Sequence, residues 1–281
     1  MVLPTVSFEN SFLQFKDLDV ASVESVIQRA GDIVFKPHKS NFYKIFYFES
    51  GSGTMNIDFN SQEIGANKII CISQEPVYWL EKIKDVKGTI IMFSADFVHQ
   101  LSSLLLPYFI CELRDDQWGS SIKSLIDLIL KEFKNSESDS IQIQEYFLNA
   151  LLLYLNRSQL PVDISNQHDY QLYFKFREHV DQSFAEKKQI SDYCSLLAIS
   201  ERKLHRLCKK YSGKSPGKII EERIVLEAKR LLSYTKLRNN EISEQLGFND
   251  DSYFIKFFRK HTEMTPKLFQ TRFQSSLPSE D

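Results

Sequence analysis

Two stretches of the chain repeat one short pattern, and this repeat decides the fold of the C-terminal part. The first stretch, ISDYCSLLAISERKLHRLCKKYSGKSP, spans residues 190–216, and the second, NNEISEQLGFNDDSYFIKFFRKHTEMTP, spans residues 239–266. When Pro216 is superposed on Pro266, Lys210 falls on Lys260 and Ser215 falls on Thr265. Self-similarity of this kind indicates one supersecondary unit that is used twice.

Each copy is predicted to fold as helix, tight turn and helix. Ser200 and Asp250 are the expected N-caps of the second helices, because a side-chain oxygen there satisfies free backbone N–H groups. The apolar residues that follow each cap are spaced at i, i+3, i+4 and i+7, which predicts one buried stripe. These stripes are Leu204, Leu207, Cys208 and Tyr211 in the first copy and Phe254, Phe257, Phe258 and His261 in the second.

The opposite face of each of these helices is polar and mostly basic. One such face alone is typical of ordinary solvated helices. Two in tandem, each preceded by a short helix and a turn, indicate DNA-reading helix-turn-helix motifs. Each copy also ends in Ser-Pro or Thr-Pro, a cap followed by proline at the first helical position.

With these motifs the chain resembles the AraC/XylS family of bacterial transcription regulators over about residues 170–274. One departure is Glu263, where the family usually has glycine, which is expected to alter only the turn after the second reading helix. The family pattern is matched at Ile199-Ser200, Leu204, Gly213, Ser215-Pro216, Arg223, Ala228, Leu231-Leu232, Gly247-Phe248, Ser252-Tyr253-Phe254, Phe258 and Thr265-Pro266.

The exposed side chains of the two reading helices are the candidate DNA contacts. Arginine donates two parallel hydrogen bonds to guanine, and an aliphatic side chain can touch the thymine methyl group. Cations near the end of such a helix are expected to meet phosphates, which position the protein without reading sequence. The expected base readers are Arg202, His205, Arg206, Ser252, Ile255 and Lys256, and the expected phosphate contacts are Lys209, Lys210, Arg259 and Lys260.

A helix over residues 216–234 is predicted to connect the two motifs. Nineteen residues at a rise of about 1.5 Å make a helix about 28 Å long. Successive major-groove segments on one side of B-DNA recur about every 34 Å. The connecting helix can therefore hold two reading helices about one turn of DNA apart, as the resemblance implies.

Charge divides the chain at the same place as the motifs. The 281 residues carry a net charge of −2, but residues 1–168 hold 14 Lys and Arg against 21 Asp and Glu, whereas residues 169–274 hold 21 against 14. A basic domain next to an acidic one indicates that only the C-terminal part meets a polyanion, here double-stranded DNA. We expect domains at 1–117, 118–156, 157–168 (a linker) and 169–274, with a tail at 275–281.

The N-terminal half predicts short strands. NFYKIFYFESGSGTMNIDF, residues 41–59, is expected to form two strands joined by a glycine turn, with further strands at residues 68–73 and 88–93. Such a series favours a sandwich or barrel. The segment from Gly31 to Gly53 resembles the cupin-like barrel that precedes the DNA-binding half in many AraC-type regulators, so the expected fold class is α+β: a barrel with helices, then an all-α domain of about seven helices.

The mouth of such a barrel is a candidate pocket for a small-molecule effector. Its expected lining is His38, Tyr43, Tyr47, Tyr78 and Trp79, although the sequence leaves open which strand face points inward and whether the barrel holds a ligand at all. A cupin metal site needs several converging histidines, whereas His38 is followed by Lys39 and Ser40. We therefore expect no metal and no cofactor.

Two amphipathic helices are predicted near residues 122–133 and 143–154. They can pack on the barrel or form a homodimer contact, and both alternatives stay open. No apolar run approaches the length of a membrane span, the N-terminus has no signal-peptide pattern, and the four cysteines have no CxxC spacing. These features favour a cytoplasmic protein with reduced thiols.

The leading hypothesis is a sequence-specific transcription regulator controlled by its N-terminal domain. The sequence contains neither a Gly-rich phosphate loop nor a recognisable pair of catalytic carboxylates. Neither of these enzyme motifs therefore argues against a regulator. The resemblance alone implies an activator and a contact with RNA polymerase. The alternatives are an N-terminal domain that only dimerises or binds a protein, and a cupin-type enzyme with a DNA-binding appendage.

Overall fold

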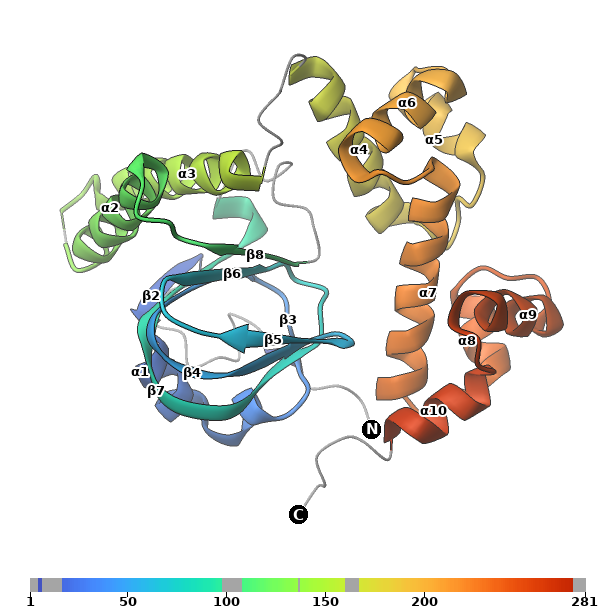
Figure 1. Ribbon diagram of the computed structural model, residues 1–281, viewed down its shortest axis with the longest axis horizontal. Coiled ribbons are helices and arrows are strands. Elements are labelled where there is room, and N and C mark those ends of the chain that lie inside the picture. The colour runs from blue at the N-terminus through green and yellow to red at the C-terminus, as the bar shows by residue number, and fades with distance from the viewer. Residues whose placement is uncertain (1–4, 7–16, 98–107, 136, 160–166, 275–281) are drawn as a thin grey trace. The chain divides into compact units, whose positions relative to one another are not determined.

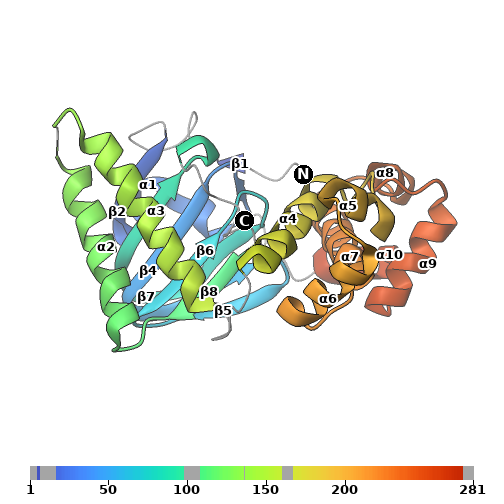
Figure 2. The same ribbon diagram turned by 90° about the horizontal axis from the view of Figure 1, so that it is seen from above.

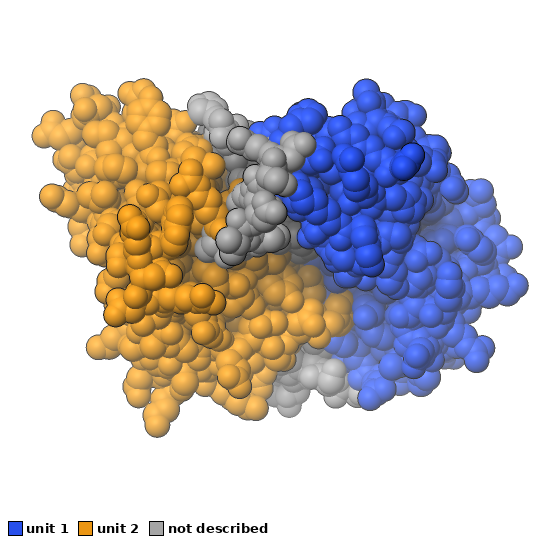
Figure 3. All heavy atoms as spheres, turned by 45° about the horizontal axis from the view of Figure 1, so that its top comes forward, with its two compact units in different colours: residues 1–3, 164–281 blue, residues 4–163 orange. Residues whose placement is uncertain are grey.

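The computed structural model describes residues 5–6, 17–97, 108–135, 137–159 and 167–274. The chain divides into two compact units, residues 4–163 and residues 164–281, which are coloured separately in Figure 3. The expected linker, residues 157–168, spans this boundary and lies partly outside the described residues. The expected tail, residues 275–281, lies wholly outside them.

The N-terminal unit is built on a six-stranded antiparallel sheet (Figure 1). The order is β2-β7-β4-β6-β8, with β5 on the other part of β4. A parallel pair, β1 and β3, stands apart. The sheet strands are β2 (Leu18–Ser22), β4 (Tyr43–Ile57), β5 (Asn60–Ile64), β6 (Lys68–Ile72), β7 (Tyr78–Phe93) and β8 (Tyr108–Glu112), and the parallel pair is β1 (Thr5–Val6) and β3 (Lys39–Ser40).

The sheet is curved but not closed, which corrects the expectation of a barrel. Its two ends, β2 and β8, do not pair with each other among the described strands. Short helical segments lie beside the open sheet instead: α1 (Val23–Ala30), η1 (Gly31–Phe35) and η2 (Ala95–Phe97). Of these, α1 and η1 pack against β7.

The glycine-rich segment is a bend within β4 and not the expected turn. β4 runs through Gly51 and Gly53 and pairs with β7 on both sides of them, with register shifts between Phe48 and Thr54. Gly51 has φ 95°, and a Cβ there would overlap the backbone of Val86. The true hairpin follows at Asp58 and Phe59, because β5 pairs Asn60 with Ile57.

Alternate side chains of β4 enter two different cores. Phe42 precedes β4, and with Phe46 and Phe48 it joins a core that includes residues of α1 and η1. Ile45 and Tyr47 join the core under α2 (Gln117–Phe133) and α3 (Ser140–Gln159). The period of two in a strand sends neighbouring residues to opposite faces. The two predicted amphipathic helices therefore pack on the sheet (Figure 2).

The C-terminal unit is all-helical, with seven helices among its described residues. They share one core, which contains residues of both predicted repeats. The connecting helix begins at Pro216 and ends at Tyr234, as the sequence predicts. The helices are α4 (Gln167–Ser183), α5 (Ile190–Leu197), α6 (Glu201–Ser212), α7 (Pro216–Tyr234), α8 (Asn239–Gln245), α9 (Asp251–Thr262) and α10 (Pro266–Gln274).

Buried arginines tie α7 to α4. Arg223 donates to Asp181 at 2.9 Å and to Glu227 at 3.0 Å, and Arg230 is 3.2 Å from Glu227. Burial raises the pKa of Asp181, although the Arg223 guanidinium opposes this shift. Removing one partner of such a network leaves a buried charge uncompensated, which costs about 3–5 kcal/mol. The network thus holds α7, which connects the two motifs, against α4.

Candidate DNA-reading surface and ligand pocket

The first helix-turn-helix consists of α5 and α6. Ser200 caps α6, because its hydroxyl accepts from the backbone N–H of Lys203 at 3.2 Å. Leu204, Leu207 and Cys208 are fully buried, so the opposite face of α6 is turned to solvent. That face exposes all five expected contacts of this helix, Arg202, His205, Arg206, Lys209 and Lys210.

Arg206 has an intramolecular partner that the sequence does not reveal. Its guanidinium donates to the carboxylate of Asp169, at the start of α4, at 3.2 Å, and Lys203 is 3.7 Å from the same carboxylate. The Arg206 side chain is nevertheless 66% exposed, whereas that of Asp169 is 12% exposed. The acid therefore holds one expected base reader in place without covering it.

The second helix-turn-helix consists of α8 and α9. Asp250 caps α9, and its pKa is lowered because its carboxylate accepts from the backbone N–H groups of Tyr253 and Ser252. Phe254 and Phe258 are buried. The expected contacts Ser252, Lys256, Arg259 and Lys260 are exposed, whereas Ile255 is partly buried and packs against the helical core.

A close contact locks the second motif to the loop before α5. Lys188 donates to the carbonyl oxygens of Ala185 and Gly247, at 2.5 and 2.6 Å, and its ammonium lies over the Phe248 ring. Gly247 has φ 67°, and a Cβ there would overlap the Ala185 carbonyl. The second motif is thus held to the loop before α5 as well as to α7, whose 19 residues span about 28 Å.

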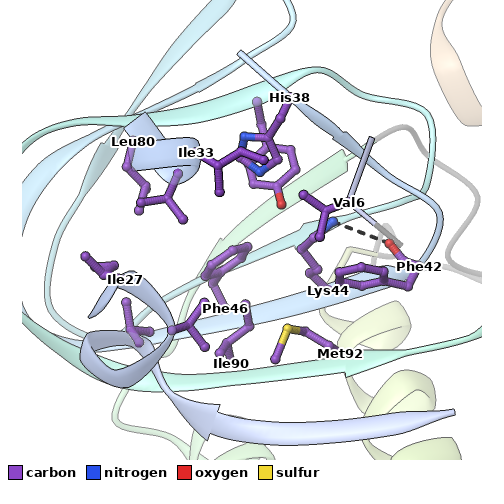
Figure 4. A pocket seen from close by; sticks show the side chains of 14 residues that line it. Val6, Ile27, Ile33, His38, Phe42, Lys44, Phe46, Leu80, Ile90 and Met92 are labelled. Carbon is purple, nitrogen blue, oxygen red and sulfur yellow. Dashed lines mark hydrogen bonds between the residues drawn. The ribbon is translucent and has the colours of Figure 1, made fainter. Parts of the chain in front are cut away.

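The N-terminal unit contains an apolar pocket between the curved sheet and the α1 and η1 segments (Figure 4). Its cavity of about 30 Å³ is lined by 14 residues, of which only His38, Lys44 and Tyr78 carry polar side-chain atoms. Such a lining, apolar with a few polar groups, is typical of small-molecule sites.

His38 and Tyr78, two of the five expected pocket residues, both line this cavity. Their rings lie 4.2 Å apart, and their backbones form an isolated antiparallel bridge. Burial lowers the pKa of His38 to about 4, so its imidazole is neutral at neutral pH. Its Nδ1 lies 2.9 Å from the Lys36 carbonyl oxygen, which can only accept, so Nδ1 carries the hydrogen. Burial also raises the pKa of Tyr78.

The other three expected pocket residues lie elsewhere. Tyr43 stacks on Phe93, and Tyr47 donates to the Asn67 side chain at 3.4 Å; both belong to the face of β4 that α2 and α3 cover. Trp79 follows Tyr78 in β7 and is partly exposed, outside the pocket lining. The alternating pattern of β4 allowed either face to line the pocket. Because α2 and α3 cover the face of Tyr43 and Tyr47, the pocket lies on the opposite face.

Lys44 is the pocket residue that sequence reasoning missed. It is 2% exposed and lies on the inner face of β4 with Phe46. The available signal was a single lysine within the run of aromatic and aliphatic residues NFYKIFYF, in phase with Phe42, Phe46 and Phe48. A charged residue in phase with a buried stripe needs an explanation, because lysine is almost never fully buried without a partner.

The described residues include neither a metal-binding cluster nor a membrane-spanning helix. No cluster of three or more His, Cys, Asp or Glu side chains that could hold a metal ion occurs there. All four cysteines have free thiols. None of the described helices combines the length and apolar character that crossing a bilayer requires.

Comparison with known proteins places both units. Residues 21–151 match the model of the AraC-like ligand binding domain, and residues 193–272 match that of a helix-turn-helix domain. The transcriptional activator RhaS of an Enterobacter species is 23% identical over 85% of this chain and 88% of its own length. RhaR of Yersinia pseudotuberculosis, also named a transcriptional activator, is 23% identical over 97% of this chain and 96% of its own.

Among solved structures, ToxT from Vibrio cholerae aligns with 91% of this chain and 97% of its own, at 16% identity and a TM-score of 0.41. Together the two domain matches span most of the sheet, most of the helical pair and nearly all of both motifs. The polar faces of α6 and α9 and the match over residues 193–272 agree on DNA binding. The chain belongs to the AraC family of DNA-binding transcription regulators, with an AraC-like ligand-binding domain before its helix-turn-helix domain.

Proposed function

We propose that the protein is a transcription activator whose contact with double-stranded DNA is controlled by a small molecule in the N-terminal pocket. The observation that carries the DNA part is the pair of capped helices, α6 and α9, which have exposed cationic faces and belong to the motifs before and after α7 in the chain. Activation is supported by the names of RhaS and RhaR, which match most of this chain.

The residue roles follow from the position of each side chain along its helix. Arg202, His205 and Arg206 are proposed to read bases from α6, and Ser252, Ile255 and Lys256 from α9. Arg202 and Arg206 lie one turn apart and suit guanine, whereas the second set offers a hydroxyl, an aliphatic group and an ammonium. Lys209, Lys210, Arg259 and Lys260 lie later in their helices and are proposed to meet phosphates.

Salt dependence tests the DNA proposal directly. Each neutralised phosphate releases counterions and contributes about −0.9 to the slope of log affinity against log salt concentration. Four phosphate contacts therefore predict a slope of about −3.6 or steeper for the full chain and for residues 169–274 alone. The measurement is fluorescence anisotropy on a site selected from random DNA, from 50 to 300 mM salt. A flat salt response, or no binding at low salt, would contradict the proposal.

We also propose that the full chain forms a homodimer through the helical pair within residues 118–156. Although α2 and α3 pack on the sheet, they leave large apolar side chains exposed. Tyr146 and Leu153, seven residues apart on α3, lie on one face of that helix and are 61% and 47% exposed. Light scattering should give a dimer mass at micromolar concentration, and Leu153→Glu should give a monomer. The idea fails if the wild type is monomeric.

Activation requires contact with the transcription machinery, so RNA polymerase is a proposed partner. A purified transcription assay with polymerase, the selected DNA site and this protein tests that step. Added protein should raise transcript yield from a promoter that carries the site and leave a promoter without the site unchanged. A fall in yield would instead identify a repressor.

A further inference from the structure

Lys44 is a buried amine with no acidic partner among the residues that the structure describes. Its ammonium donates to the Ser40 hydroxyl and, at 3.4 Å, to the backbone carbonyl of Phe42. The rings of Phe42 and Tyr78 each lie 4.5 Å from it. Among the described residues no carboxylate forms an ion pair with it, whereas other lysines of the same unit, such as Lys39 and Lys68, pair with Glu75 and Glu112 at the surface.

This arrangement is costly unless something compensates it. An ammonium has three donors, and the protein occupies two of them with neutral oxygens. Burial lowers the pKa of Lys44 well below its ordinary value, because the charged form is poorly solvated. A methionine or leucine would fill this space without that cost. The lysine therefore has a chemical use at this position.

The pocket around Lys44 favours a particular kind of ligand. Eleven of the 14 lining residues are apolar, and Lys44 is the one lining residue whose side chain can be cationic at neutral pH, since His38 is neutral there. A polyhydroxylated ligand would leave most of its hydroxyls unpaired against Val26, Leu80 and Ile90. A dianion such as a phosphate ester would bury a charge without a counterion. A monoanion with a short apolar body fits both constraints.

We propose that this pocket binds a small monocarboxylic acid, whose carboxylate pairs with the Lys44 ammonium and whose short hydrocarbon part packs against the apolar lining. This inference rests on the proposed function, in which the N-terminal unit senses a small molecule. The cavity of about 30 Å³ is small, so the acid is short or the apolar side chains shift to admit a longer one. Figure 4 shows Lys44 next to Phe42, with His38 also in the lining.

Binding has a proton balance that can be measured. Burial lowers the pKa of the Lys44 amine in the free protein, and a bound carboxylate opposes this shift, so binding of the anion draws protons from solvent onto the amine. The proton forms the ammonium, the anion supplies the negative charge, and no other bond changes. Calorimetry at pH 7 in two buffers of different ionisation enthalpy should therefore report a net proton uptake of at most one proton for each ligand bound.

The experiment uses the full chain and unbranched carboxylates of two to eight carbons, each compared with its primary amide. Wild-type protein should bind at least one carboxylate at least tenfold more tightly than the matching amide. Lys44→Met, which keeps the length of the side chain, should abolish this preference. Lys39→Met removes a lysine whose ammonium pairs with Glu75 and should leave the preference unchanged. Lys44→Gln replaces Lys44→Met if circular dichroism shows that the methionine variant is not folded.

The possible outcomes separate this inference from the proposed function. Equal binding of acids and amides, an unchanged preference in the Lys44 variants, or no carboxylate binding at millimolar concentration would each overturn the carboxylate site. DNA binding that responds to an uncharged metabolite equally in wild type and Lys44→Met would overturn it too, while effector control would stand. DNA binding that no small molecule alters would contradict effector control itself.

Discussion

The two helix-turn-helix motifs have the same architecture but differ in how each is held and in what it presents. The reading helix of the first motif, α6, packs on the core through Leu204, Leu207 and Cys208. The reading helix of the second motif, α9, packs through Phe254 and Phe258. The exposed face of α6 carries two arginines and a histidine, whereas that of α9 carries a serine, a half-buried isoleucine and a lysine. The scaffold is thus repeated while the chemistry that faces the groove is not.

The backbone shows the same contrast. The left-handed residue of the turn is Ala198 in the first motif, two residues before the cap Ser200, and Gly247 in the second, three residues before the cap Asp250. After the reading helices the left-handed residue is Gly213 in the first motif and Glu263 in the second. Different residue types therefore adopt the same left-handed backbone conformation in the two motifs. The contacts around each position determine which residue type is tolerated there.

The largest expected effect is on folding stability, when each of two left-handed glycines is replaced by alanine. The comparison separates the cost of a left-handed backbone from the cost of a steric overlap. Gly213→Ala meets no atom within 4 Å, so it should cost only the left-handed backbone, about 1–2 kcal/mol. Gly247→Ala adds an overlap with the Ala185 carbonyl and should cost about 3 kcal/mol or more. Urea denaturation of both variants measures the difference. Equal losses would mean that the contact between the second motif and the loop before α5 yields easily.

The next effect concerns base discrimination. Arg206→Ala should lower affinity for the best site by about 1–3 kcal/mol and relax preference at one base pair. Lys256→Ala, at the matching position of α9, should cost less and change preference less, because a lysine there can meet either a base or a phosphate. Lys210→Ala is the control: it should weaken all sequences equally and reduce the salt slope by about one.

Competition binding with single-base variants of the selected site measures all three substitutions. If Arg206→Ala weakened every sequence alike, α6 would not lie in the groove as proposed. If Lys256→Ala relaxed specificity more than Arg206→Ala, the second motif would be the more discriminating one.

A smaller effect is expected where the second motif departs from the first. Glu263 has φ 61° and contributes left-handed backbone without the freedom of glycine. Glu263→Gly should therefore stabilise the protein by about 1 kcal/mol, and Gly213→Glu should destabilise it by a similar amount. Thermal unfolding measures both changes. A loss of stability in Glu263→Gly would indicate that the glutamate side chain makes contacts that outweigh its strain.

The smallest effect tests the acids that hold the reading helices. The Arg206 side of its pair with Asp169 is exposed, and ion pairs open to solvent contribute about 0.2–1 kcal/mol. Asp169→Asn should therefore raise affinity for DNA by up to about fivefold, because it releases Arg206 and removes a negative charge. Glu221→Gln frees Lys260, which lies 3.9 Å from the carboxylate, and should have a weaker effect. Anisotropy at fixed salt measures both. If Asp169→Asn lowered affinity, the acid would orient Arg206 for binding and not compete with DNA.

The C-terminal unit was largely predictable from the sequence because its signals are local. Ser200, Asp250 and Pro216 lie where caps and a helix start were expected, and α7 has the predicted bounds. The spacing of the buried stripe also identified which side chains of α6 face solvent. The ion pair from Arg206 to Asp169 joins residues 37 positions apart, and no local pattern reveals such a partner.

The N-terminal unit was less predictable because its signals are ambiguous. Gly51 and Gly53 are typical of turns, yet they bend one long strand whose pairing with β7 continues past them. Period two in β4 defines two faces but not which of them is inside. That choice depends on α2 and α3, which begin only at Gln117 and Ser140 and cover the face of Tyr43 and Tyr47. Lys44 was overlooked for the same reason.

The alternation in β4 has a consequence for how this sensor can change over evolution or in the laboratory. Phe42, Lys44 and Phe46 line the pocket, while Tyr43, Ile45 and Tyr47 support the helical pair on the opposite side of the same strand. Selection for a new effector can vary the first set and leave the second intact. Neighbouring residues of the strand thus serve two separate properties, ligand specificity and support of the helical pair. A biosensor library restricted to the even positions therefore keeps the proposed dimer surface unchanged.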